Sequence, residues 1–280
     1  MYTEISDIES LRDVSQIFST SNFKSIARDN AIRYTSNKVR KHLNLKNANQ
    51  ASFESVIRYL YRELQQKYKN EYLFKNTLLN TLVLEKYSIE TTTVLSEFKI
   101  GNSIADLVLL NGEIKIFEIK TDLDNLVKLN KQLIDYCQFA NKVYVVASSK
   151  YSDKLLEEYR TSHIGIIELT NENSLREVKE AEENLNLFNH ELIFKTLRKK
   201  EYLDIIKDTH GSIPNVPNTR IFQECLQIAK EINISHFQKA TLNKLKERKL
   251  KCTHLLKSDR TPFELKYLCH ALDLSEKFLC

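Results

Sequence analysis

Three charged residues interrupt two strongly apolar segments in the middle of the chain. Asp106 lies within 104–109, where all of the remaining residues are apolar, and Glu118 and Lys120 lie within 116–120. Because side chains of a strand alternate between the two faces of a sheet, Glu118 and Lys120 share one face. Charges in central strands are unfavourable unless they are paired or bind a metal. The pattern therefore indicates a site, with a cross-strand cluster of ion pairs on an exposed sheet face as the alternative.

The turn between these two strands decides whether the two acids can meet. Asn111-Gly112 is a strong hairpin signal. A two-residue loop there would put Asp106 and Glu118 on opposite faces of the sheet. A three-residue loop that includes Glu113 would place Asp106 directly opposite Glu118. We expect this longer loop or a bulge, with the glycine in the left-handed conformation.

The residue types fit the chemistry of a hard metal ion. Two carboxylates a few ångströms apart repel each other and attract a divalent cation such as Mg²⁺. The cation lowers the pKa of a bound water and neutralises charge that develops on a phosphate. A neighbouring lysine such as Lys120 can position the attacking water or stabilise the transition state.

The segments around these residues change from helical to extended patterns. Apolar residues at helical spacing predict one helix that begins after Ser52 and another from about Glu71 to Lys86. Runs of β-branched and apolar residues predict strands at 95–100, 103–110, 114–120, 142–147 and 164–169. A helix capped by Asp122 or Asp124 should reach about Ala140.

This order of elements predicts an α/β (α+β) fold in which a mixed central β-sheet is flanked by helices. We expect a helical N-terminal region at 1–68, a core at 69–170 and a helical C-terminal region at 171–280. The chain has only four Gly and three Pro among 280 residues, which favours long regular elements with short connections.

Residues 95–147 resemble the PD-(D/E)XK superfamily of nucleases, and more closely a sparsely characterised bacterial branch of it. The likeness is carried by four segments, 97–106, 117–120, 132–136 and 143–146. The resemblance implies a restriction-endonuclease-like core. It also implies that Asp106 and Glu118 bind the metal, that the carbonyl of Ile119 is a further ligand, and that Lys120 assists the nucleophile. Ala105 stands where the family usually has a proline.

The superfamily usually adds an acid from the helix before the first strand. Glu71 opens the predicted helix and is our preferred match for this metal ligand, and Glu97 on the first strand is the competitor. Gln132 and Tyr136 lie four residues apart on one helical face. They resemble the Gln-x-x-x-Tyr signature of RecB-like nucleases, in which this helix flanks the substrate.

A basic stretch near the C-terminal end is a candidate for contacts with phosphates. Within residues 239–260 the candidates are Lys244, Arg248, Lys249 and Lys251. A solvated amphipathic helix explains the same pattern. The net charge of the whole chain, +5, permits a nucleic-acid partner but does not indicate one.

Together these features predict a nuclease that hydrolyses DNA phosphodiester bonds with Mg²⁺ or Mn²⁺. By the resemblance we expect DNA rather than RNA, and a role in genome defence or in a mobile element. The alternative is a catalytically inactive protein on the same fold that binds nucleic acid or acts through protein contacts, such as an immunity or regulatory factor. Five unpaired cysteines and the lack of a signal peptide or long apolar run predict a cytoplasmic protein that does not enter a membrane. The helical additions offer surfaces for a second copy or another protein.

Overall fold

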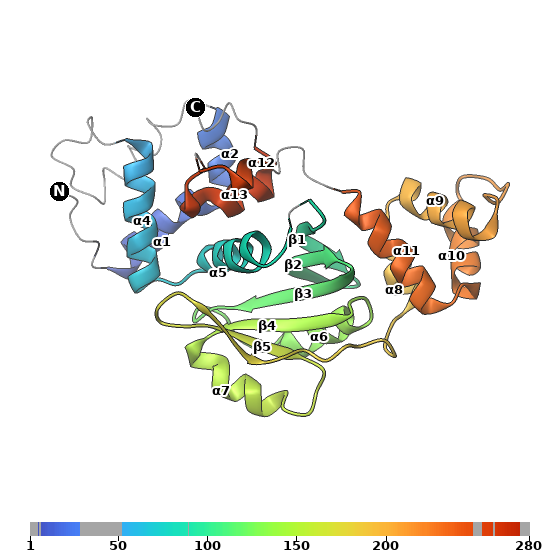
Figure 1. Cartoon of the computed structure of the whole chain (residues 1–280), viewed down its shortest axis with the longest axis horizontal. Coiled ribbons are helices and arrows are strands. Elements are labelled where there is room, and N and C mark those ends of the chain that lie inside the picture. Colours follow the sequence, from blue (N-terminus) through green and yellow to red (C-terminus); the bar gives the residue numbers. More distant parts are fainter. Residues whose placement is uncertain are drawn as a thin grey trace.

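The structure is a computed structural model, and it describes residues 5, 7–28, 52–88, 90–248, 254–259 and 261–274. At its centre lies one six-stranded sheet in which the strands follow their chain order (Figure 1). The strands are β1 (Thr93–Ile100), β2 (Ser103–Asn111), β3 (Glu113–Lys120), β4 (Lys142–Ser148), β5 (Gly165–Leu169) and β6 (Leu175–Lys179). The pairs β1–β2, β2–β3 and β5–β6 are antiparallel, whereas β3–β4 and β4–β5 are parallel. The predicted mixed sheet is confirmed.

Helices lie on both sides of this sheet and at its ends. Before β1 they are α1 (Ile8–Ser15), η1 (Gln16–Phe18), α2 (Thr20–Arg28), α4 (Phe53–Lys67), α5 (Glu71–Leu78) and η2 (Leu79–Glu85). Between strands they are α6 (Leu129–Cys137) and α7 (Ser149–Glu158). After β6 they are α8 (His190–Lys195), α9 (Lys199–His210), α10 (Ile221–Glu231), α11 (Ile234–Lys246), α12 (His254–Lys257), η3 (Phe263–Leu265) and α13 (Lys266–Leu272).

The sheet separates two apolar cores. The core on the α5 side contains Leu107, Leu109 and Phe117 from the sheet, together with buried residues of α1, α4 and α13. The core on the α6 side contains Val108, Ile116 and buried residues of α6, α7 and α8 to α11. The predicted helical additions therefore share cores with the sheet, and α13 returns from the C-terminal region to the α5 side.

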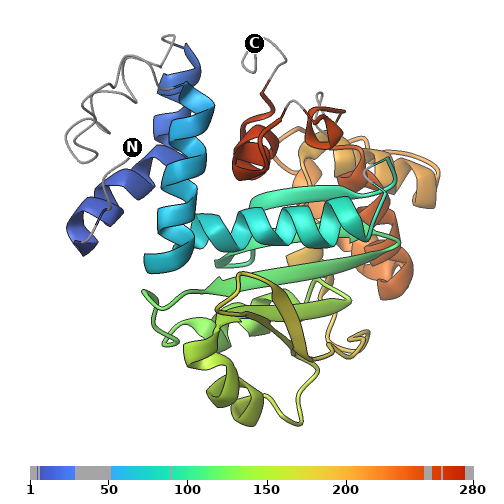
Figure 2. The same cartoon turned by 60° about the vertical axis from the view of Figure 1, so that its left-hand side comes forward.

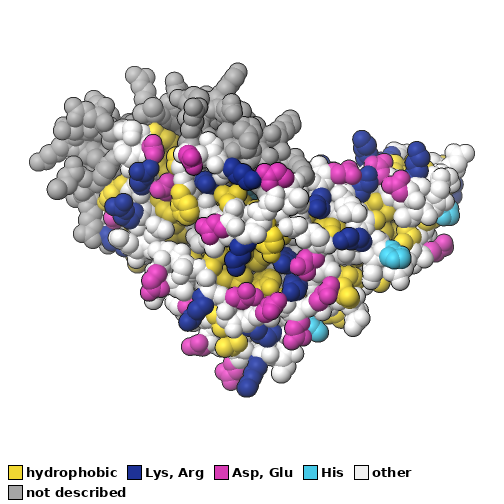
Figure 3. Space-filling view, in the orientation of Figure 1, with side chains coloured by type: hydrophobic (Ala, Val, Ile, Leu, Met, Phe, Trp, Pro, Cys, Tyr) yellow, Lys and Arg dark blue, Asp and Glu magenta, His cyan; other side chains and the backbone are white. Residues whose placement is uncertain are grey.

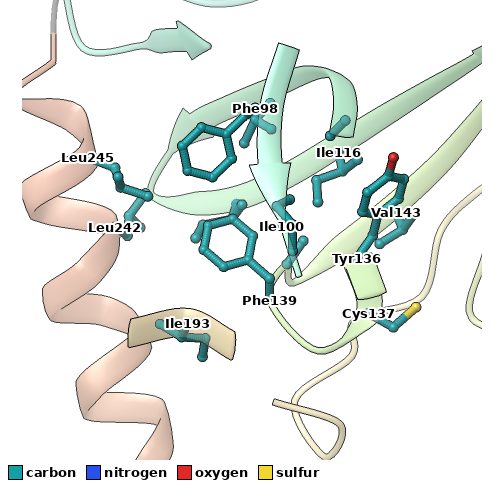
Figure 4. Close-up of a cluster of buried hydrophobic side chains, with 14 of the residues drawn as sticks. Phe98, Ile100, Ile116, Tyr136, Cys137, Phe139, Val143, Ile193, Leu242 and Leu245 are labelled. Atoms are coloured by element: carbon teal, nitrogen blue, oxygen red, sulfur yellow. The ribbon is translucent and has the colours of Figure 1, made fainter. Parts of the chain in front are cut away.

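Figure 4 shows how the C-terminal helices join the α6-side core. Leu242 and Leu245 of α11 face the sheet beside Phe98, and Phe139 packs with Phe98 at a ring-centroid distance of 5.7 Å. All four side chains are at most 9% exposed. Burying large apolar side chains contributes about 1.5–3 kcal/mol each, so this contact fixes the C-terminal bundle on the sheet.

The first two predicted helices have the expected start signals. The side chain of Ser52 accepts the backbone N–H of Ser55, so Ser52 is the N-cap of α4 as predicted. Asn70 caps α5 in the same way, through the backbone N–H of Leu73. The cap sets Glu71 at the first position of α5, and the helical path continues through η2 to Glu85.

Two predictions about secondary structure were wrong. The helix α6 begins at Leu129, not next to Asp122 or Asp124. The carboxylate of Asp124 instead accepts the backbone N–H and hydroxyl of Thr121 at 2.8 Å, and this local turn replaces the first turns of helix. Residues from 171 onward were expected to be helical, but 175–179 form β6, because pairing with the edge of β5 outweighs local pattern. Among the described residues, the helices are too short or too polar to cross a membrane.

Candidate active site

The predicted register between β2 and β3 is confirmed. Leu110 pairs with Ile114, Leu107 pairs with Phe117, and Gly112 at the turn has φ of 74°. Extending this register by one residue sets Asp106 opposite Glu118, as the three-residue turn requires. The ladder ends at Leu107, so the two strands part where the two acids lie.

The backbone of β1 and β2 is irregular at this point. Ala105 lies in the α6-side core and Leu107 in the α5-side core. In a regular strand, residues two positions apart lie on the same face of the sheet. On β1 the neighbouring Glu97 has φ of 52°, in the left-handed region that non-glycine residues rarely adopt. Such strained positions cluster at functional sites. The irregularity brings Asp106 to the boundary between the two faces.

Asp106 is held by the backbone of β3. Its Oδ2 accepts the N–H of Ile119 at 2.7 Å, and its side chain is 17% exposed. The Ile119 amide that would otherwise continue the ladder is thus bonded to a carboxylate, which fixes the direction of the second oxygen, Oδ1. That oxygen lies 3.7 Å from the ammonium of Lys75.

Lys75 joins three carboxylates that come from three elements. Its ammonium forms short ion pairs with Glu71, one turn earlier on α5, and with Glu97 of β1, in addition to its contact with Asp106. One ligand oxygen from each of Glu71, Glu97 and Asp106 lies within 4.8 Å of the others. We call Glu71, Glu97 and Asp106 the carboxylate cluster. Only 5% of the Lys75 side chain is exposed.

A second network lies on the α6 side of Asp106. Glu118 is 2% exposed. Its Oε1 accepts from Lys120 Nζ at 2.7 Å and from Gln132 Nε2 at 2.6 Å, and its Oε2 lies 2.8 Å from the hydroxyl of Tyr136. Lys120 also donates to Gln132 Oε1 at 3.1 Å. These four residues, which we call the Glu118 network, satisfy one another inside the protein.

The electrostatics of the two groups are linked through Asp106. Burial raises the pKa of Asp106 to about 8, the nearby carboxylates of Glu118 and Glu71 add to the rise, and Lys75 opposes it. Burial alone would lower the pKa of Lys75, but Tyr267, Glu71 and Asp106 raise it above its ordinary value, so the amine is protonated. Burial and Glu118 raise the pKa of Tyr136, so its phenol keeps its proton. The centre carries more negative than positive charge.

The donor set fits the predicted cation. Mg²⁺ and Mn²⁺ prefer carboxylate oxygens, and the carboxylate cluster offers one from each of three residues. Asp106 is largely protonated at neutral pH, but Glu71 and Glu97 against one ammonium still leave negative charge, and a divalent cation would balance it and favour ionised Asp106. Glu118, in contrast, is already occupied by its hydrogen bonds, and among the described residues it does not belong to the cluster.

The sequence-predicted residues therefore fall into two groups. Glu71, the preferred fourth acid, and Glu97, its competitor, both lie beside Asp106, whereas Glu118 lies with Lys120, Gln132 and Tyr136. Lys75 was not among the residues predicted from the sequence. The signal that could have found it is a lysine four residues after Glu71 on an otherwise apolar face of the helix.

Two of the four predicted phosphate-binding residues, Lys244 and Arg248, have partners within the chain. Arg248 bonds to Glu201 through both Nε, at 2.7 Å, and Nη2, at 2.5 Å, and lies over the ring of Phe98. Lys244 pairs with Asp204 at 3.3 Å. These contacts hold the end of α11, and Arg248 just after it, against α9. Lys249 and Lys251 lie outside the described residues.

Comparison with known families places most of the chain within one protein family. The model of the family described as bacteriophage P4 protein cII matches residues 64–268, from the end of α4 to α13. This range includes the sheet, the carboxylate cluster and the Glu118 network, and it is well over half of the chain. The chain belongs to the bacteriophage P4 protein cII family. The family name states no activity.

A curated relative agrees with this family. Protein cII of Enterobacteria phage P4 is 24% identical over 169 residues, which are 59% of this chain and 62% of the relative. The match thus spans less than two thirds of the relative's length. Among solved structures, the SPO1766 protein of unknown function from Silicibacter pomeroyi aligns with a TM-score of 0.29 and 13% identity, covering 46% of this chain and 87% of that one. A superposition this poor supports no conclusion about fold or function.

Proposed function

We propose that this cII-family protein is a metal-dependent nuclease that hydrolyses DNA phosphodiester bonds. The observation that carries the proposal is the convergence of Glu71, Glu97 and Asp106 where β2 and β3 part, next to a buried lysine–glutamate pair. Perturbed, partly buried ionisable groups collected from separate elements are typical of catalytic centres. The resemblance of 95–147 to the PD-(D/E)XK superfamily supports the same reaction.

Each group has a role in this proposal. The carboxylate cluster would hold Mg²⁺ or Mn²⁺, which when bound supplies stabilisation of the negative charge that develops on the phosphate. Lys120 would hold the attacking water near its ammonium, because Glu118 and Gln132 fix the position of Nζ. Tyr136 would fix Glu118 in turn, since its hydroxyl lies 2.8 Å from both Glu118 Oε2 and the carbonyl oxygen of Ile104.

The assignment of metal ligands differs from the one that the resemblance implies. There, Glu118 and the Ile119 carbonyl are ligands. We propose that Glu97 takes the place of Glu118, because the Glu118 oxygens accept three hydrogen bonds in the folded protein. The target DNA, a role in genome defence or in a mobile element, and a cytoplasmic location are further parts of the proposal.

One observation favours the alternative of an inactive protein on this fold. The Lys75 ammonium already lies among the three carboxylates, where it contributes the positive charge that they require. In a protein that only binds nucleic acid or another protein, this arrangement would be a permanent ion-pair cluster. In a nuclease, Lys75 and the metal ion compete for the carboxylates.

A cleavage assay separates the two functions. Purified wild type, Lys120→Ala and Asp106→Asn would be incubated with linear, nicked and single-stranded DNA and with RNA, each with Mg²⁺, Mn²⁺ or EDTA. We expect metal-dependent cleavage by wild type, and a loss of about 100-fold or more in both variants. Equal cleavage by wild type and both variants would show a contaminating nuclease, and cleavage by none would favour the inactive protein.

A further inference from the structure

An open cleft of about 740 Å³ reaches two members of the carboxylate cluster, Glu71 and Glu97. Glu71, Lys75 and Glu97 line its inner part, and the segment after β3 contributes Thr121 and Leu123. The opposite wall is formed by α1, η1 and the start of α2, with α13 closing one side. Figure 2 shows this arrangement, with α1 and α2 beside α4 at one end of α5 and α13 above α5.

Apart from Glu71, Lys75 and Glu97, the charged residues among those described that line the cleft are two cations and one acid, namely Arg12, Lys24 and Asp124. Arg12 on α1 and Lys24 on α2 both line the cleft and are exposed. Neither forms an ion pair with any residue that the structure describes, whereas Lys67 and Arg58 on neighbouring α4 are paired with Glu63 and Glu54. Two cations that have no ion-pair partner among the described residues, in a cleft that also contains Glu71 and Glu97, suit a ligand with more than one phosphate, spaced along a chain.

The cleft also offers apolar surface at its mouth. The side chain of Leu123 lines the cleft although 60% of the residue is exposed, and the half-buried ring of Tyr68 lines it as well. Large apolar side chains beside cations are the usual combination in proteins that bind single strands, since unpaired bases stack or rest on them while phosphates contact Lys and Arg.

The size of the cleft excludes a duplex in it. A volume of about 740 Å³ is that of a site for small molecules, which range over roughly 300–1,000 Å³. A few nucleotides fit, but a double helix does not. On the face that Figure 3 shows, the Lys and Arg side chains of the described residues are interspersed with Asp and Glu.

We propose that the cleft holds a single-stranded DNA segment, with its phosphates on Arg12 and Lys24 and one phosphodiester at the carboxylate cluster. This inference rests on the proposed nuclease function and narrows its substrate to single strands or frayed ends. The N-terminal helices, which lie largely outside the family match at 64–268, would then select the substrate.

Binding measured without metal tests the inference separately from cleavage. The probes are a fluorescent 12-nucleotide oligothymidine and a fully paired hairpin of equal charge, titrated in EDTA at several salt concentrations. The variant Arg12→Gln/Lys24→Gln is compared with Lys195→Gln/Lys230→Gln, which removes the same charge from exposed sites on α8 and α10 that do not line the cleft.

We expect wild type to bind the oligothymidine more tightly than the hairpin. The cleft variant should lose about fivefold or more in affinity, and its salt slope should fall by about 1.4, the value for two lost contacts with a single strand. The control variant should behave as wild type. Equal binding by the two double variants, or preference for the hairpin, would overturn the inference.

The two proposals can fail separately. If the single strand binds through Arg12 and Lys24 but no DNA is cleaved with Mn²⁺, the binding inference stands and the nuclease proposal falls. If the cleft variant cleaves single-stranded DNA as fast as wild type at subsaturating substrate, the nuclease proposal stands and this inference falls.

Discussion

Asp106 accepts the backbone N–H of Ile119 at 2.7 Å, at the point where the ladder between β2 and β3 ends. The bond places a carboxylate where a backbone carbonyl would continue the sheet. Asp106 can therefore face the α5 side, where Glu71, Glu97 and Lys75 lie, while it remains close to the buried Glu118 network on the α6 side.

Asp106→Asn should stabilise the protein when no metal is present. The amide oxygen can still accept the Ile119 N–H, and the folded protein no longer contains a carboxyl group whose ionised form is disfavoured by burial, Glu118 and Glu71. We expect the free energy of unfolding in EDTA to rise by about 1 kcal/mol, as for other strained active sites. Urea denaturation measures it. Destabilisation by more than about 1 kcal/mol would mean that the Lys75 contact outweighs the repulsion.

A second prediction concerns the left-handed backbone conformation at Glu97. Asn adopts this conformation more readily than Glu, and the Glu97 side chain is 59% exposed, so its ion pair adds little. Glu97→Asn should leave stability unchanged or raise it by up to about 1 kcal/mol, while metal affinity falls. Glu113→Asn, at a residue of ordinary φ, is the control and should give no gain. A clear loss of stability in Glu97→Asn alone would refute the strain argument.

Sequence patterns predicted much of this site, and the parts that they could not predict depend on how distant elements pack. Apolar runs and Asn111-Gly112 are local signals, so they correctly predicted strands β1 to β5 and the register between β2 and β3, which the ladder shows as far as Leu107 and Phe117. Whether Glu71 or Glu97 completes the site depends on how α5 packs on the sheet, which is not local; the structure brings both to Asp106. Lys75 was missed because a buried lysine is recognised only by partners on other elements.

Tyr136→Phe should weaken both the fold and the reaction. The change leaves Glu118 Oε2 and the carbonyl of Ile104 without this hydroxyl, at a position where Tyr136 is fully buried. We expect a loss of about 1–3 kcal/mol in unfolding free energy. Tyr151→Phe, which removes a solvent-exposed hydrogen bond to the Asp124 carbonyl, should change it by less than about 0.5 kcal/mol. Equal effects in the two variants would contradict the proposed support of Glu118.

His270 should make the protein sensitive to acid. Burial lowers its pKa to about 4, and its Nδ1 has no hydrogen-bond partner among the described residues. Between the ordinary value of 6.5 and about 4, the unfolded chain binds a proton here and the folded chain does not, so stability falls as pH falls through this window. The loss approaches about 3 kcal/mol by pH 4.

Replacing the imidazole isolates this effect. In His270→Leu the slope of unfolding free energy against pH between 6.5 and 4 should be smaller than in wild type by nearly one proton. The exposed His236 gives the control, since His236→Asn should keep the wild-type slope. An unchanged slope in His270→Leu would show that His270 is not the group that titrates.

Calorimetric titration with Mn²⁺ tests the cation site most directly. Wild type should bind the ion, Asp106→Asn should bind it at least about tenfold more weakly, and Lys75→Met should bind it more tightly, because the competing ammonium is removed. Denaturation curves in EDTA confirm that each variant is folded. Equal Mn²⁺ binding by wild type and Asp106→Asn, or weaker binding by Lys75→Met, would contradict a metal site at Glu71, Glu97 and Asp106.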